Sequence, residues 1–243
     1  MVLRIIGSSS AGNGYVLRTR SGHSLLLEAG VPGAAVRAAL DHDILHVDGC
    51  IVSHSHGDHA GRVRDILADG IRCYALPETL QELGLDEHPF CAALTPQRQT
   101  AIGGWTVMPL PVLHDVPCAA YVIAHHEMGR LLFATDTPAL GYRIPRLDHI
   151  LIEANYSDEC LTEAIEAGQT EAAMRGRLLS SHMELGTAIR WLQGCDLSRV
   201  REVVLIHLSP DNADPAAFVE TVTRATGVPT YAAAPGMELD LTL

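Results

Sequence analysis

One ten-residue stretch constrains this chain more than any other. It reads Ile51-Val52-Ser53-His54-Ser55-His56-Gly57-Asp58-His59-Ala60 and follows an apolar run typical of a buried strand. Three histidines and an aspartate therefore fall within six residues. Imidazole and carboxylate groups are ligands for divalent metals, and zinc binds them at about 2.0–2.2 Å. A single histidine is usually a surface or core residue, whereas four such side chains at this spacing predict a metal site on a loop at a strand end.

The composition is that of a globular protein. The chain has 243 residues, 47% apolar and 19% charged, which is enough to bury a sizeable core. We expect residues 1–243 to form a single domain. No apolar run reaches the roughly 18 residues of a membrane span, and the N-terminus lacks a signal-peptide pattern. We therefore expect a cytoplasmic protein with no membrane partner, whose six scattered cysteines are reduced and mostly buried.

The net charge restricts the partners. It is −12, whereas proteins that coat nucleic acid nonspecifically usually carry a basic surface. Divalent ions bound at the carboxylates would offset part of this charge locally. A nucleic-acid substrate is therefore compatible with the sequence only if it is held at the site itself.

Hydrophobic patterning predicts an α/β protein. Strands are expected at residues 3–7, 14–19, 24–28, 49–53, 71–76, 105–113, 120–124, 130–135, 149–153, 202–207 and 230–241. Helices are expected at residues 32–40, 61–69, 158–167, 184–193 and 214–226, the last between an Asp214-Pro215 start and a Gly227 stop. Strand-rich stretches followed by helices, in two rough halves, predict two sheets with helices on their outer faces.

Three other candidate ligands stand, like the opening cluster, directly after an apolar run that is expected to form a strand. They are His114, Asp136 and His207. Together these residues predict two metal ions about 3.5–4 Å apart, bridged by Asp136 and a water or hydroxide. We expect the first ion to be held by His54, His56, His114 and Asp136, and the second by Asp58, His59, His207 and Asp136.

The pattern H-x-H-x-D-H after a strand, with the later His, Asp and His, resembles the metallo-β-lactamase superfamily over nearly the whole chain. The resemblance implies a four-layer αβ/βα sandwich of two mixed sheets with helices on the outer faces. The resemblance is more specific to one branch of the superfamily, the YycJ/WalJ-like branch. The segments that carry it are residues 7–13, 26–30, 135–137, 153–155 and 207–209. That branch is associated with exonuclease or phosphodiesterase activity on DNA.

Ligand identity separates the branches of this superfamily. True β-lactamases usually carry cysteine at the place of Asp136, and flavodiiron oxidoreductases carry glutamate at the place of His56. With aspartate and histidine at these positions, the chain is expected to be a hydrolase with two divalent ions, Zn²⁺ or Mn²⁺.

A second signal comes from Glu153, at the end of an apolar run, and His182, just before a helix. Nuclease branches resembling tRNase Z carry a Glu and a His at comparable places. The resemblance implies that the carboxylate orients the imidazole, which protonates the leaving oxygen. Asp58 would position the nucleophile, so Asp58, Glu153 and His182 are the predicted catalytic residues. The alternatives are a glutamate bonded to a backbone donor and a helix-capping histidine. In that branch the histidine usually follows a glycine and precedes Ser-Asn. In this chain His182 follows a serine and precedes Met-Glu, at residues 181–184.

The sequence thus predicts a dinuclear metal-dependent phosphodiesterase or nuclease, with DNA ends or a small nucleotide as its phosphodiester substrate. Two alternatives stay open, a lactonase or thioesterase and a non-catalytic metal-binding regulatory module. Three weaker signals also have two interpretations each. The glycine-rich segment 7–14 is either a turn or a phosphate-binding loop, and Asn155 and Asn212 either contact substrate or cap the backbone.

Overall fold

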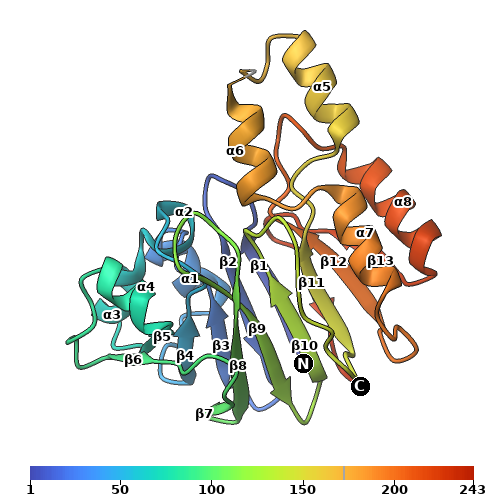
Figure 1. The fold of residues 1–243 in the computed structure, drawn as a ribbon. Helices are drawn as coiled ribbons and strands as arrows, with labels where there is room; N and C mark the ends of the chain where they lie inside the picture. The colour runs from blue at the N-terminus through green and yellow to red at the C-terminus, as the bar shows by residue number, and fades with distance from the viewer. Residues whose placement is uncertain (172) are drawn as a thin grey trace.

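The computed structural model describes residues 1–171 and 173–243 and places their strands in two seven-stranded sheets (Figure 1). The first sheet has the order β14 (Glu238–Asp240), β1 (Val2–Gly7), β2 (Gly14–Arg18), β3 (Ser24–Leu27), β4 (Val47–Ile51), β5 (Cys73–Ala75) and β6 (Cys91–Ala93). The second has the order β13 (Thr230–Ala232), β12 (Glu202–Ile206), β11 (His149–Glu153), β10 (Gly129–Ala134), β9 (Cys118–His125), β8 (Trp105–Val112) and β7 (Thr100–Ile102). Both sheets are mixed, with parallel pairing from β3 to β6 and from β10 to β13.

Helices cover the outer faces of both sheets (Figure 1). They are α1 (Gly33–Ala39), α2 (Gly57–Ala60), α3 (Val63–Ala68) and α4 (Pro77–Glu82) beside the first sheet, and α5 (Asp158–Glu166), α6 (Met174–Ser181), α7 (Leu185–Gln193) and α8 (Pro215–Thr226) beside the second. Helices α5 and α6 project past the sheet at the top of Figure 1. None of the helices in the described part of the chain has the length and apolarity needed to cross a membrane.

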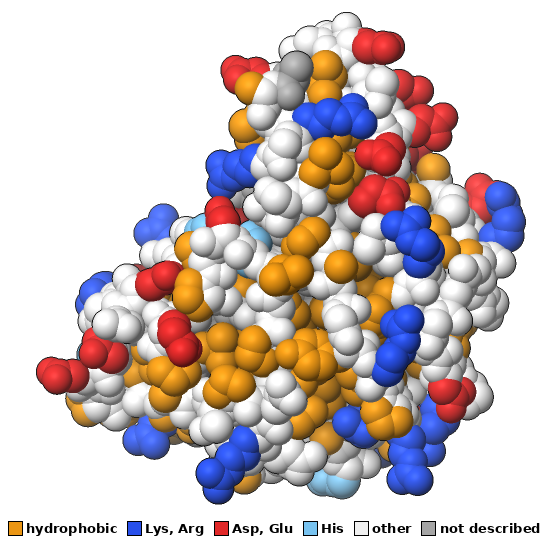
Figure 2. Space-filling view, in the orientation of Figure 1, with side chains coloured by type: hydrophobic (Ala, Val, Ile, Leu, Met, Phe, Trp, Pro, Cys, Tyr) orange, Lys and Arg blue, Asp and Glu red, His pale blue; other side chains and the backbone are white. Residues whose placement is uncertain are grey.

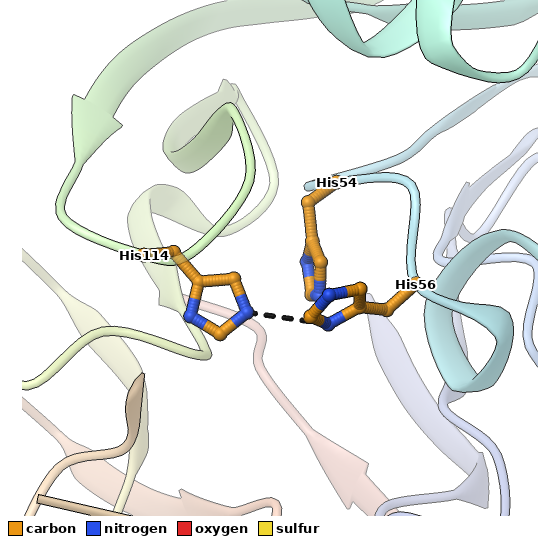
Figure 3. A group of neighbouring side chains, drawn as sticks. All are labelled: His54, His56 and His114. Carbon is orange, nitrogen blue, oxygen red and sulfur yellow. Dashed lines mark hydrogen bonds between the residues drawn. The ribbon is translucent and has the colours of Figure 1, made fainter. Parts of the chain in front are cut away.

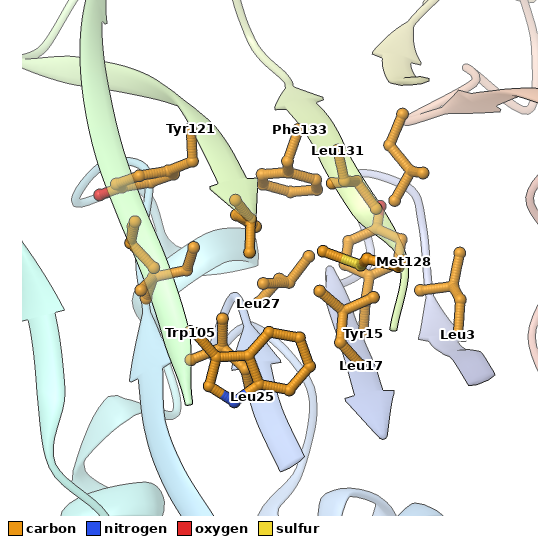
Figure 4. Packing of buried hydrophobic residues seen from close by; sticks show 14 of the residues in the cluster. Leu3, Tyr15, Leu17, Leu25, Leu27, Trp105, Tyr121, Met128, Leu131 and Phe133 are labelled. Atoms are coloured by element: carbon orange, nitrogen blue, oxygen red, sulfur yellow. The ribbon is translucent and has the colours of Figure 1, made fainter. Parts of the chain in front are cut away.

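Three apolar cores separate the layers, so the expected four-layer sandwich is confirmed. The central core joins the inner faces of the two sheets, where Tyr15 meets Phe133 edge to face with ring centroids 5.4 Å apart (Figure 4). Trp105 lies in this core. A second core places Trp191 of α7 against the second sheet, and a third packs α1, α3 and α4 on the first sheet. All five residues of β11 are buried, as expected for a parallel strand that is covered on both faces.

The predicted strand at residues 230–241 was wrong as a single element. It is two strands, β13 paired with β12 in one sheet and β14 paired with β1 in the other. The chain crosses between the sheets through Pro235 and Gly236, whose φ of 83° favours glycine. The predicted helix at 61–69 also differs, because α2 already begins at Gly57 and α3 is a separate helix. Strands β6 and β7 and helices α4 and α6 were not predicted, since three to eight residues carry little periodicity.

The six cysteines are free thiols, as predicted, but only half of them are fully buried. Cys50, Cys73 and Cys118 are buried, and the other three are partly exposed.

Candidate metal centre and active site

Three strands deliver their polar side chains through the same backbone turn. Glu28 and His207 directly follow β3 and β12, and Asp136 follows β10 after Thr135; their φ angles are 69°, 53° and 47°. The left-handed region is costly for residues other than glycine, and such residues concentrate at functional sites. Each turn ends a strand abruptly and brings its side chain to the edge of the sandwich where the His54–His59 loop lies.

The first predicted ligand group is assembled from two loops (Figure 3). Ligand atoms of His54, His56 and His114 lie within 4.8 Å of one another. Nε2 of His114 is 3.3 Å from Nδ1 of His56. Nε2 of His54 is buried and has no hydrogen-bond partner in the described part of the chain. A buried polar atom without a partner is costly, and a cation among these rings would satisfy it.

The ligand atoms of the second predicted group are closely spaced. Nε2 of His59 lies 3.3 Å from Asp58 Oδ2 and 3.2 Å from Asp136 Oδ1. Nε2 of His207 lies 3.2 Å from the same Asp58 oxygen and 3.8 Å from the same Asp136 oxygen. A tetrahedron with metal bonds of 2.0–2.2 Å has edges of about 3.3–3.6 Å. The distances from Asp58 to His59 and His207 are close to such edges, so these three side chains can share one ion.

Asp136 lies between the two groups. Its Oδ1 faces His59 and His207, whereas its Oδ2 is 3.9 Å from Nε2 of His54. The carboxylate thus has one oxygen on each side, which is the arrangement that a bridging ligand requires.

Four histidines have polar neighbours on the ring edge that faces away from the cluster. The Nδ1 atoms of His54 and His114 bond Ser53 Oγ (2.8 Å) and the Ser181 carbonyl (3.1 Å). Those of His59 and His207 lie 3.5 Å from the carboxylates of Glu28 and Glu153. Metal-binding histidines usually have their second ring nitrogen held in this way, which directs Nε2 toward the ion.

The electrostatics of the pocket favour the metal-binding forms of His54 and Asp58, whereas the carboxylates around His59 outweigh burial and raise the pKa of its ring. Burial and the neighbouring His59 lower the pKa of His54 to about 2, so its imidazole is neutral. Burial raises the pKa of Asp58, but hydrogen bonds from His207 and His59 outweigh it and hold the pKa well below its usual range. Asp58 is therefore ionised.

The structure brings Glu153 and His182 together. Nδ1 of His182 donates to Oε1 of Glu153 over 2.7 Å, and Oε2 of this fully buried carboxylate accepts from the backbone N–H groups of Thr137 (3.1 Å) and Met183 (3.0 Å). Burial lowers the pKa of His182, but the Glu153 carboxylate outweighs it and raises the pKa to about 9. His182 also lines the hollow over the metal ligands, with His56, His114 and Asp136.

Two supporting residues have no distinctive signal in the sequence. Asn13 is buried, and its Nδ2 donates to the Asp58 carbonyl (3.2 Å) and lies 3.1 Å from Nε2 of His59. Glu28 accepts from the Ser53 N–H (3.2 Å) behind the histidine loop. Only their places within resembling segments, 7–13 and 26–30, could have drawn attention to them.

A third unpredicted residue, Asp115, lies beside the first ligand group. Its Oδ1 is 3.1 Å from Nε2 of His114 and 3.3 Å from Nε2 of His56. Its position next to His114 in the chain was the available signal.

The weaker predictions have structural contacts. In the glycine-rich segment, Ser8 Oγ accepts from the His207 N–H (2.9 Å), and the Asn13 N–H donates to the Asp58 carbonyl (2.7 Å), so this loop supports the metal-centre backbone. Asn155 Nδ2 donates to the His207 carbonyl (2.8 Å). Asn212 accepts from Thr170 (2.8 Å) at the wall of an adjoining cavity.

Residues 26–208 match the family described as the beta-lactamase superfamily domain. The chain belongs to this superfamily. No curated protein matches this superfamily member by sequence. Its fold is similar to that of the metallo-beta-lactamase fold protein YhfI from Bacillus subtilis, with a TM-score of 0.76, 17% identity and 98% of each chain covered.

Two further solved structures share the metallo-hydrolase fold of this superfamily member. Zn²⁺-bound PqqB from Methylobacterium extorquens aligns with a TM-score of 0.70 and 14% identity over 99% of this chain and 100% of that one. Human tRNase Z, short form, aligns with a TM-score of 0.64 and 15% identity over 100% of both chains. Proteins of this fold bind divalent metals, as the zinc in PqqB illustrates.

Proposed function

We propose that this superfamily member is a dinuclear metal-dependent phosphodiesterase that works with Zn²⁺ or Mn²⁺. One ion would be held by His54, His56, His114 and Asp136, and the other by Asp58, His59, His207 and Asp136. The unpartnered Nε2 of His54 and the distances of 3.2–3.3 Å from Asp58 to His207 and His59 support this assignment. When bound, the ions would supply Lewis acidity toward phosphoryl oxygens and an acidified water as nucleophile.

The protein's own groups have separate tasks in this proposal. Asp58 is ionised and lines the hollow, so it can orient the attacking water and accept its proton. His182 holds a proton on Nδ1 that is shared with Glu153, and its ring lines the same hollow. The doubly protonated ring of His182 would donate its Nε2 proton to the departing oxygen, and Glu153 would keep the ring in place through Nδ1.

The observation that carries the proposal is the 2.7 Å contact between Glu153 and His182 beside the ligand cluster. A phosphodiester loses an alkoxide, which departs slowly without a proton donor, whereas a thiolate leaving group needs such help less. A positioned acid therefore favours a phosphodiester over a thioester. The resemblance to the YycJ/WalJ-like branch and the shared fold with human tRNase Z agree with this choice.

The test combines one variant with two leaving groups. The protein, loaded with Zn²⁺ or Mn²⁺, is assayed on bis(p-nitrophenyl) phosphate and on labelled DNA ends, RNA and cyclic nucleotides. His182→Ala should reduce kcat about 10²- to 10⁴-fold on the natural esters, and less on the p-nitrophenyl ester, whose leaving group needs no proton. Hydrolysis of a lactone or thioester with no phosphodiester cleaved would contradict the proposal. Metal binding without turnover of any substrate would instead favour the regulatory module.

A further inference from the structure

A second cavity adjoins the candidate metal centre and shares a wall with it. The cavity has a volume of about 540 Å³, and the hollow over the metal ligands has about 250 Å³. Both are lined by Ser10, Arg177, His182 and His207. Figure 2 shows histidine side chains at the bottom of a hollow between α2 and α6. A ligand that reacts at the metal centre can therefore extend directly into the larger cavity.

Arg177 of α6 is the cation of the shared wall. No carboxylate in the part of the chain that the structure describes lies within 4.0 Å of its guanidinium. The sequence contains no lysine, so every fixed positive side chain is an arginine. A guanidinium donates two parallel hydrogen bonds to phosphate oxygens. An unpaired arginine at the junction thus suits a phosphate whose ester bond lies at the metal centre.

The rest of the cavity wall is rich in acceptors. Glu171 and Asp211 line the large cavity only, and neither forms an ion pair with another described residue. Oδ1 of Asn155, at the same wall, is buried without a hydrogen-bond partner among the described residues. Acceptors of this kind match ligand donors such as sugar hydroxyls, which carboxylates commonly bind in nucleotide sites.

We propose that this cavity binds the ribonucleoside of a small nucleotide phosphodiester, with Arg177 on its non-reacting phosphate oxygens. The inference rests on the proposed phosphodiesterase function and names its substrate class. The volume suits one nucleoside, since ligand pockets span about 300–1,000 Å³.

The surface around the cavity disfavours a nucleic-acid polymer. Acidic side chains gather over α5, which begins with Asp158 and Glu159, and basic side chains are scattered singly over this face (Figure 2). A polyanion would need a continuous basic path along its backbone.

Arg175 supplies a matched control on the same helix. It pairs with Asp158 (3.8 Å) and lines neither the cavity nor the hollow. Arg175→Ala and Arg177→Ala therefore remove the same charge from α6, one outside and one inside the proposed site.

The probes are uridine, uridine 5′-monophosphate and its 2′-deoxy analogue, titrated calorimetrically into zinc-loaded protein. Arg177→Ala should weaken monophosphate binding about 10- to 100-fold and leave uridine binding unchanged, because only the phosphate contact is lost. Arg175→Ala should change neither affinity. Asp211→Asn, on an exposed loop, should weaken the binding of uridine and of the monophosphate by the same factor. The wild type should bind the deoxy analogue less tightly than the ribonucleotide.

Turnover of bis(p-nitrophenyl) phosphate by the wild type is measured in parallel. Turnover without binding of any nucleoside probe overturns the cavity assignment and leaves the phosphodiesterase intact. Nucleotide binding that depends on Arg177, without any phosphodiester turnover, supports the cavity and overturns the phosphodiesterase. Equal losses in the two arginine variants, or equal affinity for the ribo and deoxy forms, also count against the assignment.

Discussion

Oε1 of the buried Glu153 lies 2.7 Å from Nδ1 of His182, and this pair joins the end of β11 to the end of α6. Oε1 of Glu153 is also 3.5 Å from Nδ1 of His207. One carboxylate therefore supports both the proposed acid and a proposed metal ligand. Its second oxygen is already bonded to two backbone N–H groups, so the side chain has little freedom to move.

The pair should make stability depend on pH in the metal-free protein. The pKa of His182 is about 9 when folded, against about 6.5 in an unfolded chain, because the Glu153 charge outweighs the effect of burial. The stabilisation is fully present below pH 6.5 and is lost as the pH rises through about 9. In Glu153→Gln, the pKa of His182 should fall by at least one unit, which an NMR titration of the ring protons measures. The stability difference between wild type and variant should shrink between pH 6.5 and 9. An unchanged pKa of His182 in the variant would show that the pair is not coupled.

Metal stoichiometry should separate the two ligand groups. His54→Ala should remove one ion and Asp136→Asn should weaken both, because the two carboxylate oxygens of Asp136 face different groups. Elemental analysis after dialysis measures this. His23→Ala is the control, since His23 belongs to none of the candidate ligand groups among the described residues and pairs with Asp48 (3.1 Å). Two ions retained by Asp136→Asn would rule out a bridging role.

Glu28 should tune metal affinity without touching an ion. Its carboxylate is 3.5 Å from Nδ1 of His59 and bonds the Ser53 N–H, so it orients the ring and increases its basicity. Glu28→Gln should weaken binding of one ion about 10- to 100-fold, measured by competition with a chromophoric chelator. Glu238→Gln, on the exposed strand β14, should leave the affinity unchanged. An equal affinity in both variants would mean that Glu28 only supports the loop.

Two glycines flank Asp58 in different ways. A Cβ added at Gly30 would lie 1.7 Å from the Asp58 carbonyl oxygen, whereas one added at Gly57 would meet nothing within 4 Å. Gly30→Ala should lower the free energy of unfolding by about 1–3 kcal/mol and reduce metal content, because the loop must shift. Gly57→Ala should leave both within error. Urea denaturation measures the free energy of unfolding of the two variants. Equal values for Gly30→Ala and Gly57→Ala would mean that the loop moves freely.

Much of the candidate ligand cluster could be picked out from the sequence because its pattern is local. His54, Asp136 and His207 each follow an apolar run, although their strands belong to both sheets, β4 to the first and β10 and β12 to the second. The strand and helix order was readable for the same reason, since each long element carries its own periodicity. Short elements such as β6 and β7 were missed, and so was the crossing at Gly236, which depends on pairing with strands far away in the chain.

The sequence by itself determined the four-layer architecture and the set of side chains available as ligands. Both follow from local properties of the chain, namely the spacing of its apolar residues and the position of polar residues at the ends of strands. Only the tertiary structure decided which atoms meet. The position of Asn13 behind Asp58 and the 3.5 Å distance from Glu153 to Nδ1 of His207 join residues 45 and 54 positions apart. The opening of the metal hollow toward Arg177 likewise depends on where α6 packs. Such contacts depend on how buried surfaces fit together in space, and no local pattern in the chain encodes them.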